Sequence, residues 1–410
     1  MTLNKTHIVS LLQMIVLLLF VSYEAFSYID AGAVEKTAYY LLIIILLGTI
    51  SFLRAPDMHS LQRLNLSWIG LLAFFFVTVY LVRVLYDLYI ANVPFLMTTH
   101  KGTIPFLFFC AAVVPLVLMP QMDFHAINWS VFNKCCYVIF VGMGLYSLYL
   151  NLTGQLMDSI FADGRMVGNA SMDTIGFGHL GVTIVIASMA VMQERSWLWK
   201  IAGAVTIIMG VGIMFGAGSR GPMVAIVVCV LVYLYAKGYK MSAIFAIPII
   251  LLLFYLLYPV INNFFTDQGN FAIERIYNSI FRADEMEDVT SLRDALYAEM
   301  TDSFLSHPIL GDSFLLKDGQ YVHNFVFEAF LATGVLGGTV FLLLMACTLV
   351  YAVRLIQINP IFIFAALLFV QHMSYGMFSR SLAILPVFWF SMYCVWCVYN
   401  TYSTPTKVIV

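Results

Sequence analysis

The side chains best suited to chemistry are one histidine and a few arginines near the ends of apolar runs. His323 stands in Tyr321-Val322-His323-Asn324, and Arg220 stands in segment 216–222. Histidine exchanges protons near neutral pH, and the guanidinium group of arginine binds phosphate oxygens through paired hydrogen bonds. Together they favour a site that binds an anionic group and moves a proton.

The neighbours of Arg220 also suit an anion. Gly216 and Gly218 allow close approach of the backbone, and Pro222 is favourable in the first turn of a helix. We therefore predict a tight turn between two helices. At the start of the second helix, Ser219, Arg220 and free backbone N–H groups would bind an anionic oxygen.

Three further arginines lie at or near predicted helix ends on the same side: Arg165, Arg293 and Arg380. An arginine at the membrane boundary is costly unless it is paired, so each is a candidate for function. Such an arginine can also reach out to lipid phosphates, and Arg293 can pair with nearby loop acids. Both interpretations stay open.

The residues after His323 are predicted to support it. Asn324 and Glu328 are four residues apart and share one helix face, whereas His323 points elsewhere, so Glu328 need not be its partner. Gly334 and the pair Gly337-Gly338 follow on the same helix. We expect these small residues to let another helix pack closely.

Composition places the chain in a membrane. It has 410 residues, of which 62% are hydrophobic and only 10% charged, whereas a soluble domain carries about 25% charged residues. The apolar runs recur throughout, so one membrane domain, residues 1–410, is the simplest organisation. The seven cysteines lie inside apolar runs, where a thiol behaves as a small hydrophobic group.

The sequence predicts an all-α integral membrane protein with about twelve spanning helices, each about 20 residues long. The expected spans are 8–26, 38–53, 67–86, 103–120, 132–150, 175–193, 198–217, 221–236, 242–260, 325–353, 360–378 and 382–400. Spans one to nine thus occupy residues 1–260, a large outer loop occupies 261–322, and the last three spans occupy 323–410.

The distribution of lysine and arginine predicts that both termini are cytoplasmic. The inner side would then carry Lys5, Arg54, Arg63, Lys134, Arg195, Lys200, Lys237, Lys240, Arg354 and Lys407, opposed by Asp57, Asp123 and Glu194. Most acids fall on the outer side, together with His323 and the candidate arginines. All candidate site residues therefore share one side of the membrane.

The outer loop is predicted to contain short amphipathic helices. Ser291-Leu292-Arg293-Asp294 has the form of a capping box at a helix start. Leu292, Leu296, Met300 and Phe304 then recur every fourth residue, which predicts an apolar stripe facing the membrane or the bundle. His307-Pro308 is expected to end this helix, and Gly311-Asp312 to make a turn.

Several kinds of site are not indicated. The sequence has no metal-binding motif, no phosphate-binding Walker loop and no dinucleotide fingerprint, so no metal and no cofactor are expected. Arg83 and Asp87 are one helical turn apart and are expected to form a structural ion pair. Nothing in the sequence suggests a nucleic-acid partner.

These motifs resemble a known family. His323-Asn324, nine residues, then Gly334-x-x-Gly337-Gly338, after a large outer loop late in the chain, is similar to the bacterial O-antigen ligase and O-antigen polymerase superfamily. Ser219-Arg220-Gly221, the helix from Ser291 to Pro308-Ile309-Leu310-Gly311, and Ser379-Arg380-Ser381 resemble further parts of it. The likeness covers residues 160–385 best.

The resemblance implies a metal-independent glycosyltransferase of the bacterial inner membrane. Members take a glycan from an undecaprenyl-pyrophosphate carrier at the periplasmic face. Ligases transfer it to lipid A-core, and polymerases transfer it to another lipid-linked repeat unit. By motif, Arg220 and Arg293 would bind the pyrophosphate and His323 would act at the acceptor hydroxyl, while Arg165 and Arg380 match more loosely.

Three alternatives stay open: another activity of this family (a polymerase rather than a ligase, or a capsule or teichoic acid homologue), a transporter, and an assembly subunit. Arg165, followed by ten residues and Gly176, resembles an arginine–glycine spacing of polymerases, whereas the His323 pattern resembles that of ligases. A lipid-linked oligosaccharide transporter or flippase is a different class, but a transporter is expected to place ionisable groups at mid-membrane. A catalytically silent assembly subunit would leave the set of arginines unexplained.

Overall fold

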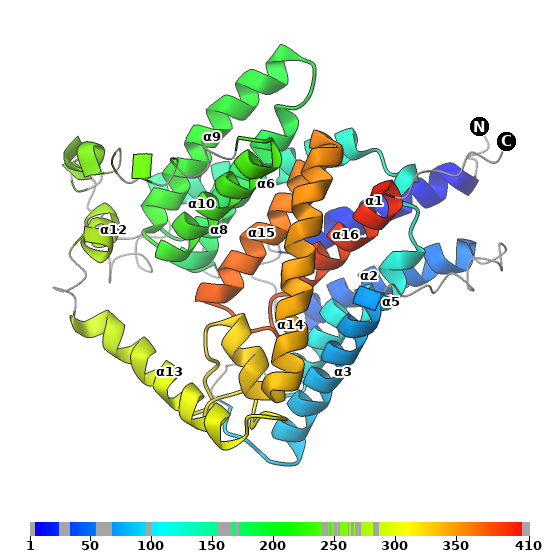
Figure 1. The fold of residues 1–410 in the computed structure, drawn as a ribbon. Helices are drawn as coiled ribbons and strands as arrows, with labels where there is room; N and C mark the ends of the chain where they lie inside the picture. The colour runs from blue at the N-terminus through cyan, green and yellow to red at the C-terminus, as the bar shows by residue number, and fades with distance from the viewer. Residues whose placement is uncertain are drawn as a thin grey trace.

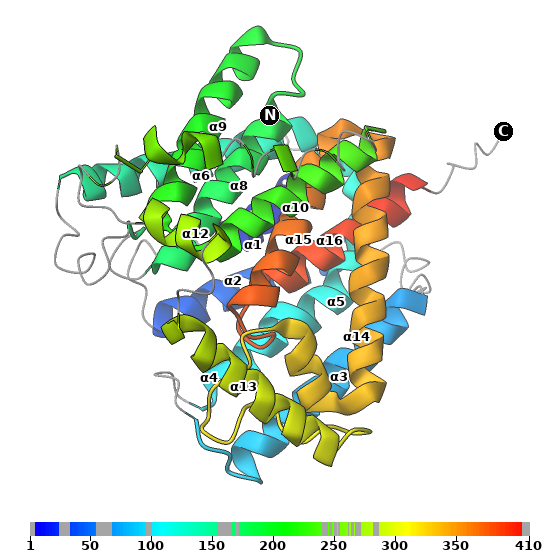
Figure 2. The ribbon, with the colours of Figure 1, turned by 60° about the vertical axis from the view of Figure 1, so that its left-hand side comes forward.

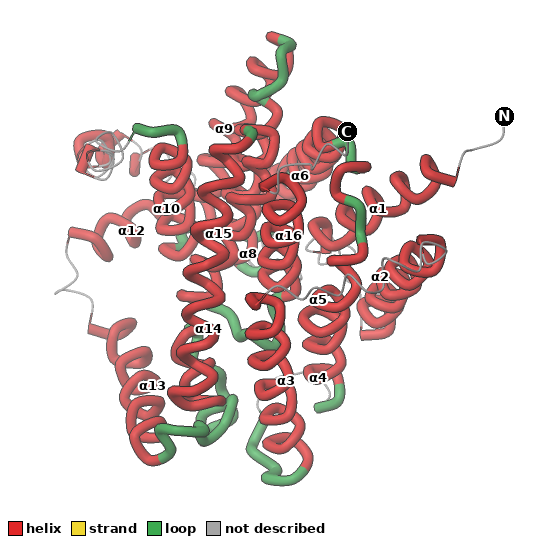
Figure 3. Tube along the Cα trace, turned by 45° about the vertical axis from the view of Figure 1, so that its right-hand side comes forward, coloured by secondary structure: helices red, strands yellow, loops and turns green. Residues whose placement is uncertain are grey.

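We describe the protein from a computed structural model. The structure describes residues 5–23, 33–54, 68–95, 101–153, 166–168, 172–239, 272–281 and 287–403, with scattered positions between 245 and 266. These residues form helices and loops and no strand (Figure 3). The predicted all-α class is confirmed for this part of the chain.

Figure 1 shows the helices of the described residues in chain order, coloured from blue to red. Their bounds are α1 Lys5–Val21, α2 Ala33–Arg54, α3 Trp68–Tyr89, α4 Thr103–Phe108, η3 Phe109–Val113, α5 Val114–Leu118, η4 Met119–Gln121, η5 Phe124–Ala126, α6 Trp129–Leu152, α8 Thr174–Val191, α9 Trp197–Ala217, α10 Arg220–Ala236, α12 Ala272–Phe281, α13 Glu287–Ser306, α14 Phe325–Ile358, η7 Pro360–Phe362, α15 Ile363–Phe378 and α16 Pro386–Ser403.

Eight described helical segments are long and apolar enough to cross a membrane, as expected for a polytopic membrane protein. They are Thr37–Arg54, Trp68–Tyr89, Thr103–Gln121, Trp129–Leu152, Thr174–Val191, Trp197–Ala217, Phe325–Ile358 and Pro360–Phe378. Two expected spans form the shorter apolar helices His7–Val21 and Arg220–Ala236, and 382–400 forms α16. About half of the expected span 242–260 lies outside the described residues, so the count of twelve stays a prediction.

The centre of the bundle is formed by α8, α15 and α16, which are buried on nearly every side (Figures 1 and 2). Of the apolar window in α8 or α15, 78% is buried, against 28% in α2 or α9. A helix that is apolar all round belongs inside a bundle. In contrast, α2 and α9 keep apolar side chains on the outside, where lipid can cover them.

Close helix packing occurs where glycines of α8 and α9 face each other. A Cβ atom on Gly181 would lie 2.5 Å from the carbonyl oxygen of Gly210, and one on Gly210 would lie 2.7 Å from that of Gly181. Without side chains the two backbones can approach. The sequence interpretation expected this role at Gly334, Gly337 and Gly338 instead.

Contacts at one end of the bundle bring the two ends of the described chain together. Ser10, near the start of α1, donates a hydrogen bond to the carbonyl of Ala126 at 2.6 Å. Tyr402, near the end of α16, donates one to the carbonyl of Phe124 at 3.2 Å. Both partners belong to η5, so the start of α1 and the end of α16 share this end of the bundle. The candidate site lies elsewhere, at the helix ends described below.

Helix α14 is broken at Gly334, which has φ 64° and ψ −164°. The break divides it into a short arm, residues 325–333, and a long segment, residues 335–358. In Figure 2 the short arm stands beside the lower part of the long segment rather than continuing it. A Cβ atom on Gly334 would lie only 2.2 Å from the carbonyl oxygen of Ile309, so a side chain cannot fit there.

Gly337 and Gly338 also make the break in α14 possible. A Cβ atom on Gly337 would lie 2.1 Å from Oγ1 of Thr333, and one on Gly338 would lie 2.6 Å from the ring of Phe330. Their nearest neighbours are thus residues of the short arm. The expectation that these glycines admit another helix is wrong, because they make room for the arm of their own helix.

The loop 308–312 satisfies backbone groups that the break leaves without helical partners. Val335 donates its N–H to the carbonyl of Pro308 at 2.8 Å, and Asp312 donates its N–H to that of Leu331 at 2.8 Å. Arg83 of α3 donates from Nε to the carbonyl of Ala332 at 3.0 Å. Within a membrane, unpaired backbone groups are costly, so these bonds stabilise the break.

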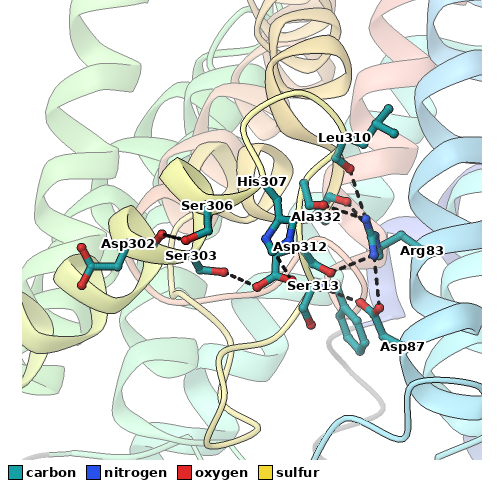
Figure 4. A network of polar contacts seen from close by, with 12 residues as sticks. Arg83, Asp87, Asp302, Ser303, Ser306, His307, Leu310, Asp312, Ser313 and Ala332 are labelled. Carbon is teal, nitrogen blue, oxygen red and sulfur yellow. Dashed lines mark hydrogen bonds and ion pairs between the residues drawn. The ribbon is translucent and has the colours of Figure 1, made fainter.

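Arg83 also holds the loop itself (Figure 4). Its two terminal nitrogens donate to the carbonyls of Asp312 at 2.8 Å, Gly311 at 2.9 Å and Leu310 at 3.2 Å. Asp87 lies 3.6 Å from the guanidinium group and accepts the N–H of Phe314 at 2.8 Å. The expected structural ion pair is confirmed, and it is one part of a larger network.

Helix α13 covers the short arm. Leu296 and Met300 are buried against Leu331, and the ring of Phe304 packs edge-on to that of Phe330 at 5.9 Å. The apolar stripe predicted from sequence therefore faces the bundle. Its predicted end at His307 is also confirmed, since α13 ends at Ser306.

The predicted start of α13 is wrong. The helix begins at Glu287, so Ser291 lies within it rather than capping it. The helix is therefore about one turn longer than the capping-box motif suggests.

We expect Gly334→Ala to lower the free energy of unfolding by about 2–4 kcal/mol, because a side chain would be strained at positive φ and would collide with the loop. Thermal unfolding of the purified protein in detergent measures the effect. Gly142→Ala in α6 is the matched control, since its added Cβ meets nothing within 4 Å. Equal stability of the two variants would contradict this account of the break.

Candidate functional site

Arg220 lies where the sequence places it, in a tight turn between α9 and α10. Gly218 ends α9 in the left-handed conformation, with φ 59°, and donates its N–H to the carbonyl of Phe215 at 3.0 Å. Ser219 is the N-cap residue of α10, and its side chain makes no capping hydrogen bond. Arg220 is exposed as the first residue of α10, as predicted.

Arg380 lies in the loop between α15 and α16. Its Nε donates a hydrogen bond to the hydroxyl of Tyr375 at 2.7 Å, and its guanidinium group lies 5.2 Å from the centre of the Tyr375 ring. A terminal nitrogen lies 3.9 Å from Oδ1 of Asp173, the N-cap residue of α8. Burial opposes the charged form of Arg380, but Tyr375 and Asp173 outweigh it and raise its pKa.

The turn with Arg220 and the loop with Arg380 meet at the same end of the bundle. A Cβ atom on Gly221, next to Arg220, would lie 3.7 Å from Cβ of Phe378, two residues before Arg380. Helices α8, α10 and α15 pack against one another throughout (Figure 2). The structure therefore brings together two arginines that are far apart in the sequence.

His323 precedes the short arm and joins this end of the bundle. It is half-buried and adopts positive φ, 59°. Its ring lies 4.2 Å from that of Tyr321. Asn324 caps the arm by accepting the N–H groups of Val326 and Phe327 at 3.0 and 3.1 Å.

Asn324 and the first residue of the arm attach it to the end of α15. The side-chain amide of Asn324 donates to the carbonyl of Met377 at 3.2 Å. A Cβ atom on Gly376 would lie 2.1 Å from the ring of Phe325, so the ring occupies the space that glycine leaves. His323 is thereby placed beside the loop that carries Arg380.

Tyr321 is electrostatically coupled to the same group of residues. Burial raises the pKa of its phenol, and the nearby carboxylates of Glu328 and Asp173 raise it further, whereas Arg380 acts in the opposite direction. The net shift is upward. The phenol therefore stays protonated at neutral pH and can donate a hydrogen bond beside His323.

Glu328 ties the short arm to the loop after α15. It is fully buried and accepts hydrogen bonds from the hydroxyls of Tyr80 and Ser381, the latter at 2.8 Å. It also accepts the N–H of Leu382, at 3.1 Å from Oε2. Its carboxylate thus connects α3, the arm and the loop that carries Arg380.

Two predicted site residues are placed less fully. Arg165 lies outside the described residues, although the next residue, Met166, donates its N–H to the carbonyl of Gly216 at 2.9 Å. That contact is four residues from Arg220. Arg293 belongs to α13, but its side chain lies outside the described residues, so its predicted contact with pyrophosphate stays a prediction.

Sequence reasoning missed Asp173, Tyr375 and His179 near the site. Asp173 carried a local signal, because an aspartate before an apolar helix is a typical N-cap. His179 carried another, as an ionisable residue inside a predicted span. No sequence signal pointed to Tyr375, because its role depends on which helix packs beside it.

The described part of the site contains the guanidinium groups of Arg220 and Arg380 beside the carboxylates of Asp173 and Glu328. No group of three or more histidine, cysteine, aspartate or glutamate residues in the described chain is placed to hold a metal ion. Two guanidinium groups, the start of a helix and a histidine can bind an anion and exchange a proton. No protein-family model matches the sequence, and a search of curated proteins finds no match.

We expect Glu328→Ala to lower the free energy of unfolding by about 3 kcal/mol, because buried donors of Tyr80, Ser381 and Leu382 would lose their acceptor. Denaturant unfolding followed by tryptophan fluorescence measures this. Glu274→Ala, at an exposed position of α12, should change stability little. If the two variants lost equal stability, Glu328 would not be the tether described here.

Proposed function

We propose that this protein is a glycosyltransferase of the O-antigen ligase and polymerase type in the bacterial inner membrane. It would transfer a glycan from undecaprenyl pyrophosphate to an acceptor hydroxyl at the periplasmic face. The acceptor is lipid A-core or a lipid-linked glycan. The observation that carries the proposal is that three distant segments, which carry Arg220, Arg380 and His323, lie side by side at one end of an apolar helical bundle.

The two arginines fit the pyrophosphate of the donor. Pyrophosphate presents several charged oxygens, which guanidinium groups bind in pairs. Charge grows on the leaving phosphate as the sugar–oxygen bond breaks, and fixed cations at a low-dielectric site stabilise it. Tyr375 and Asp173 hold Arg380 in place before substrate binds, so its orientation costs less on binding.

His323 fits the acceptor side of the reaction. A base near the acceptor hydroxyl can remove its proton while the sugar carbon is attacked. The left-handed backbone of His323 is uncommon outside glycine and often occurs at functional sites. Its half-buried ring, with Tyr321 on one side, leaves part of its surface open to a substrate.

The buried acids argue against a transporter. Transporters use ionisable residues near mid-membrane to couple ions and substrate. Here Glu328 and Asp87 are each engaged by protein donors, and both tie helices to loops at one end of the bundle. Their contacts are structural, so a transferase accounts better for the polar residues.

We expect Arg220→Lys to lower the rate of glycan transfer by at least about 100-fold, because lysine cannot bind two phosphate oxygens in a fixed plane. His323→Ala should lower it by about 10²–10⁴-fold. The assay uses purified protein in lipid vesicles with a lipid-linked glycan. Arg354→Lys, at an exposed position that contacts Tyr399, is the control, and near-normal rates for both site variants would refute the mechanism.

Deletion of the gene should alter surface glycolipids in a way that separates the two family activities. Electrophoresis of lipopolysaccharide would show loss of all long chains, with polymer left on the carrier lipid, if the protein is a ligase. A cap of one repeat unit would identify a polymerase. An unchanged ladder would contradict both roles in lipopolysaccharide synthesis.

A further inference from the structure

His179 is a buried histidine without hydrogen-bond partners for its ring. Its side chain is fully buried in α8, and neither ring nitrogen has a partner among the described residues. By comparison, Nδ1 of the neighbouring buried His372 lies 2.9 Å from the carbonyl oxygen of Leu368. Buried polar atoms nearly always have a partner, so the nitrogens of His179 need a physical reason.

The ring of His179 faces the start of α10. A Cβ atom on Gly221 would lie 3.7 Å from Nε2 of His179. Glycine therefore leaves a space of about one side-chain atom beside this nitrogen. A Cβ atom on Gly178 would lie 2.6 Å from Cγ of Pro222, so α8 and α10 are in close contact here and the imidazole is held against the helix start.

The other side of His179 reaches the residue that holds Arg380. Its ring stacks on that of Tyr375, with centres 3.7 Å apart and planes 20° apart. The hydroxyl of Tyr375 accepts the hydrogen bond from Nε of Arg380. His179 thus lies between the turn with Arg220 and the support of Arg380.

The backbone around His179 is fixed independently of its ring. Its carbonyl accepts hydrogen bonds from the hydroxyl of Thr183 at 3.0 Å and from the amide of Gln371 at 2.9 Å. These bonds join α8 to α15. The ring nitrogens are therefore not needed to hold the two helices together.

We propose that His179 is a phosphate-binding residue of the donor site. In the tautomer with its hydrogen on Nε2, neutral imidazole has one N–H to donate, and it would donate to a phosphate oxygen at the start of α10. Arg220 and the backbone N–H groups at the start of α10 would supply the other donors. Nε2 is fully buried in this structure, so the phosphate oxygen would enter the space of about one side-chain atom that Gly221 leaves beside it.

This inference rests on the proposed function, because the phosphate would belong to the polyprenyl pyrophosphate donor. His179 would add a neutral hydrogen-bond donor to the two arginines. One phosphate of the donor would then lie at the turn that contains Arg220. This binding also gives a reason for an unpaired imidazole in the core. The nitrogen gains its partner when the substrate binds.

Two variants test the role of His179 through binding of farnesyl pyrophosphate to the detergent-purified protein. His179→Phe keeps an aromatic ring against Tyr375 and removes both nitrogens. Gly221→Ala adds a methyl group whose nearest neighbours would be 3.7 Å away, an ordinary contact, and alanine favours a helix. Each variant should raise the Kd by about tenfold or more through loss of one hydrogen bond to a charged group.

The controls separate binding from folding. Melting temperatures of both variants should stay near that of the wild type. Gly212→Ala in α9, where an added Cβ meets nothing within 4 Å, should leave the Kd unchanged. His179→Gln restores an N–H donor and should bind more tightly than His179→Phe.

The outcomes distinguish this inference from the proposed function. If the wild type binds farnesyl pyrophosphate and transfers glycan, but His179→Phe and Gly221→Ala bind equally tightly, the role of His179 is refuted and the proposed function stands. If the wild type neither binds this probe nor transfers glycan, both are refuted. Weaker binding by both variants, with normal melting temperatures, supports both.

Discussion

The position of the candidate site depends on one break in a helix. At Gly334 the carbonyls of Leu331 and Ala332 and the N–H of Val335 are satisfied from outside α14, by the loop 308–312 and by Arg83. A buried backbone group without a partner is costly. The break therefore exists only together with the loop and with α3, and those three parts set the direction of the short arm.

The short arm connects the break in α14 to the candidate site residues His323 and Arg380. At one end it contacts the Arg83 network, and at the other Asn324 and Phe325 dock on α15. Between them, Glu328 holds Ser381 and Leu382, next to Arg380. The positions of His323 and of the loop that carries Arg380 thus both depend on the short arm. Substitutions at the break and at Glu328 should both alter the positions of the site residues, although neither place touches a substrate.

The charges of the site are arranged so that its buried acids are held by protein donors, whereas Arg220 is exposed. The buried carboxylates of Glu328 and Asp87 are occupied by donors of the protein itself, and Asp173 lies at the edge of the cluster, 3.9 Å from Arg380. Arg220 is exposed at a helix start, where the helix dipole adds to its charge. Such a distribution favours an anionic group that enters from this end of the bundle.

The amino-acid sequence by itself determined the membrane class, most helix positions and the turn at Arg220. These follow from local causes, namely apolar runs of membrane length and the conformational preferences of glycine and proline. It also indicated Arg220, Arg380 and His323 as candidates, because charged and ionisable residues are rare in such a chain. Their common location could be inferred only as a shared side of the membrane.

Only the tertiary structure decided how those residues meet. From the sequence, the glycines after His323 are expected to form a face against which another helix packs. In the structure they accommodate a break in their own helix, and residues 308–312 and Arg83 supply hydrogen-bond partners at this break. Asp173, Tyr375 and His179 join the site because α8 and α15 pack together at their ends. Such contacts join residues far apart in the chain. No local pattern encodes them, since each depends on which helices share the centre of the bundle and on which backbone groups lack partners there.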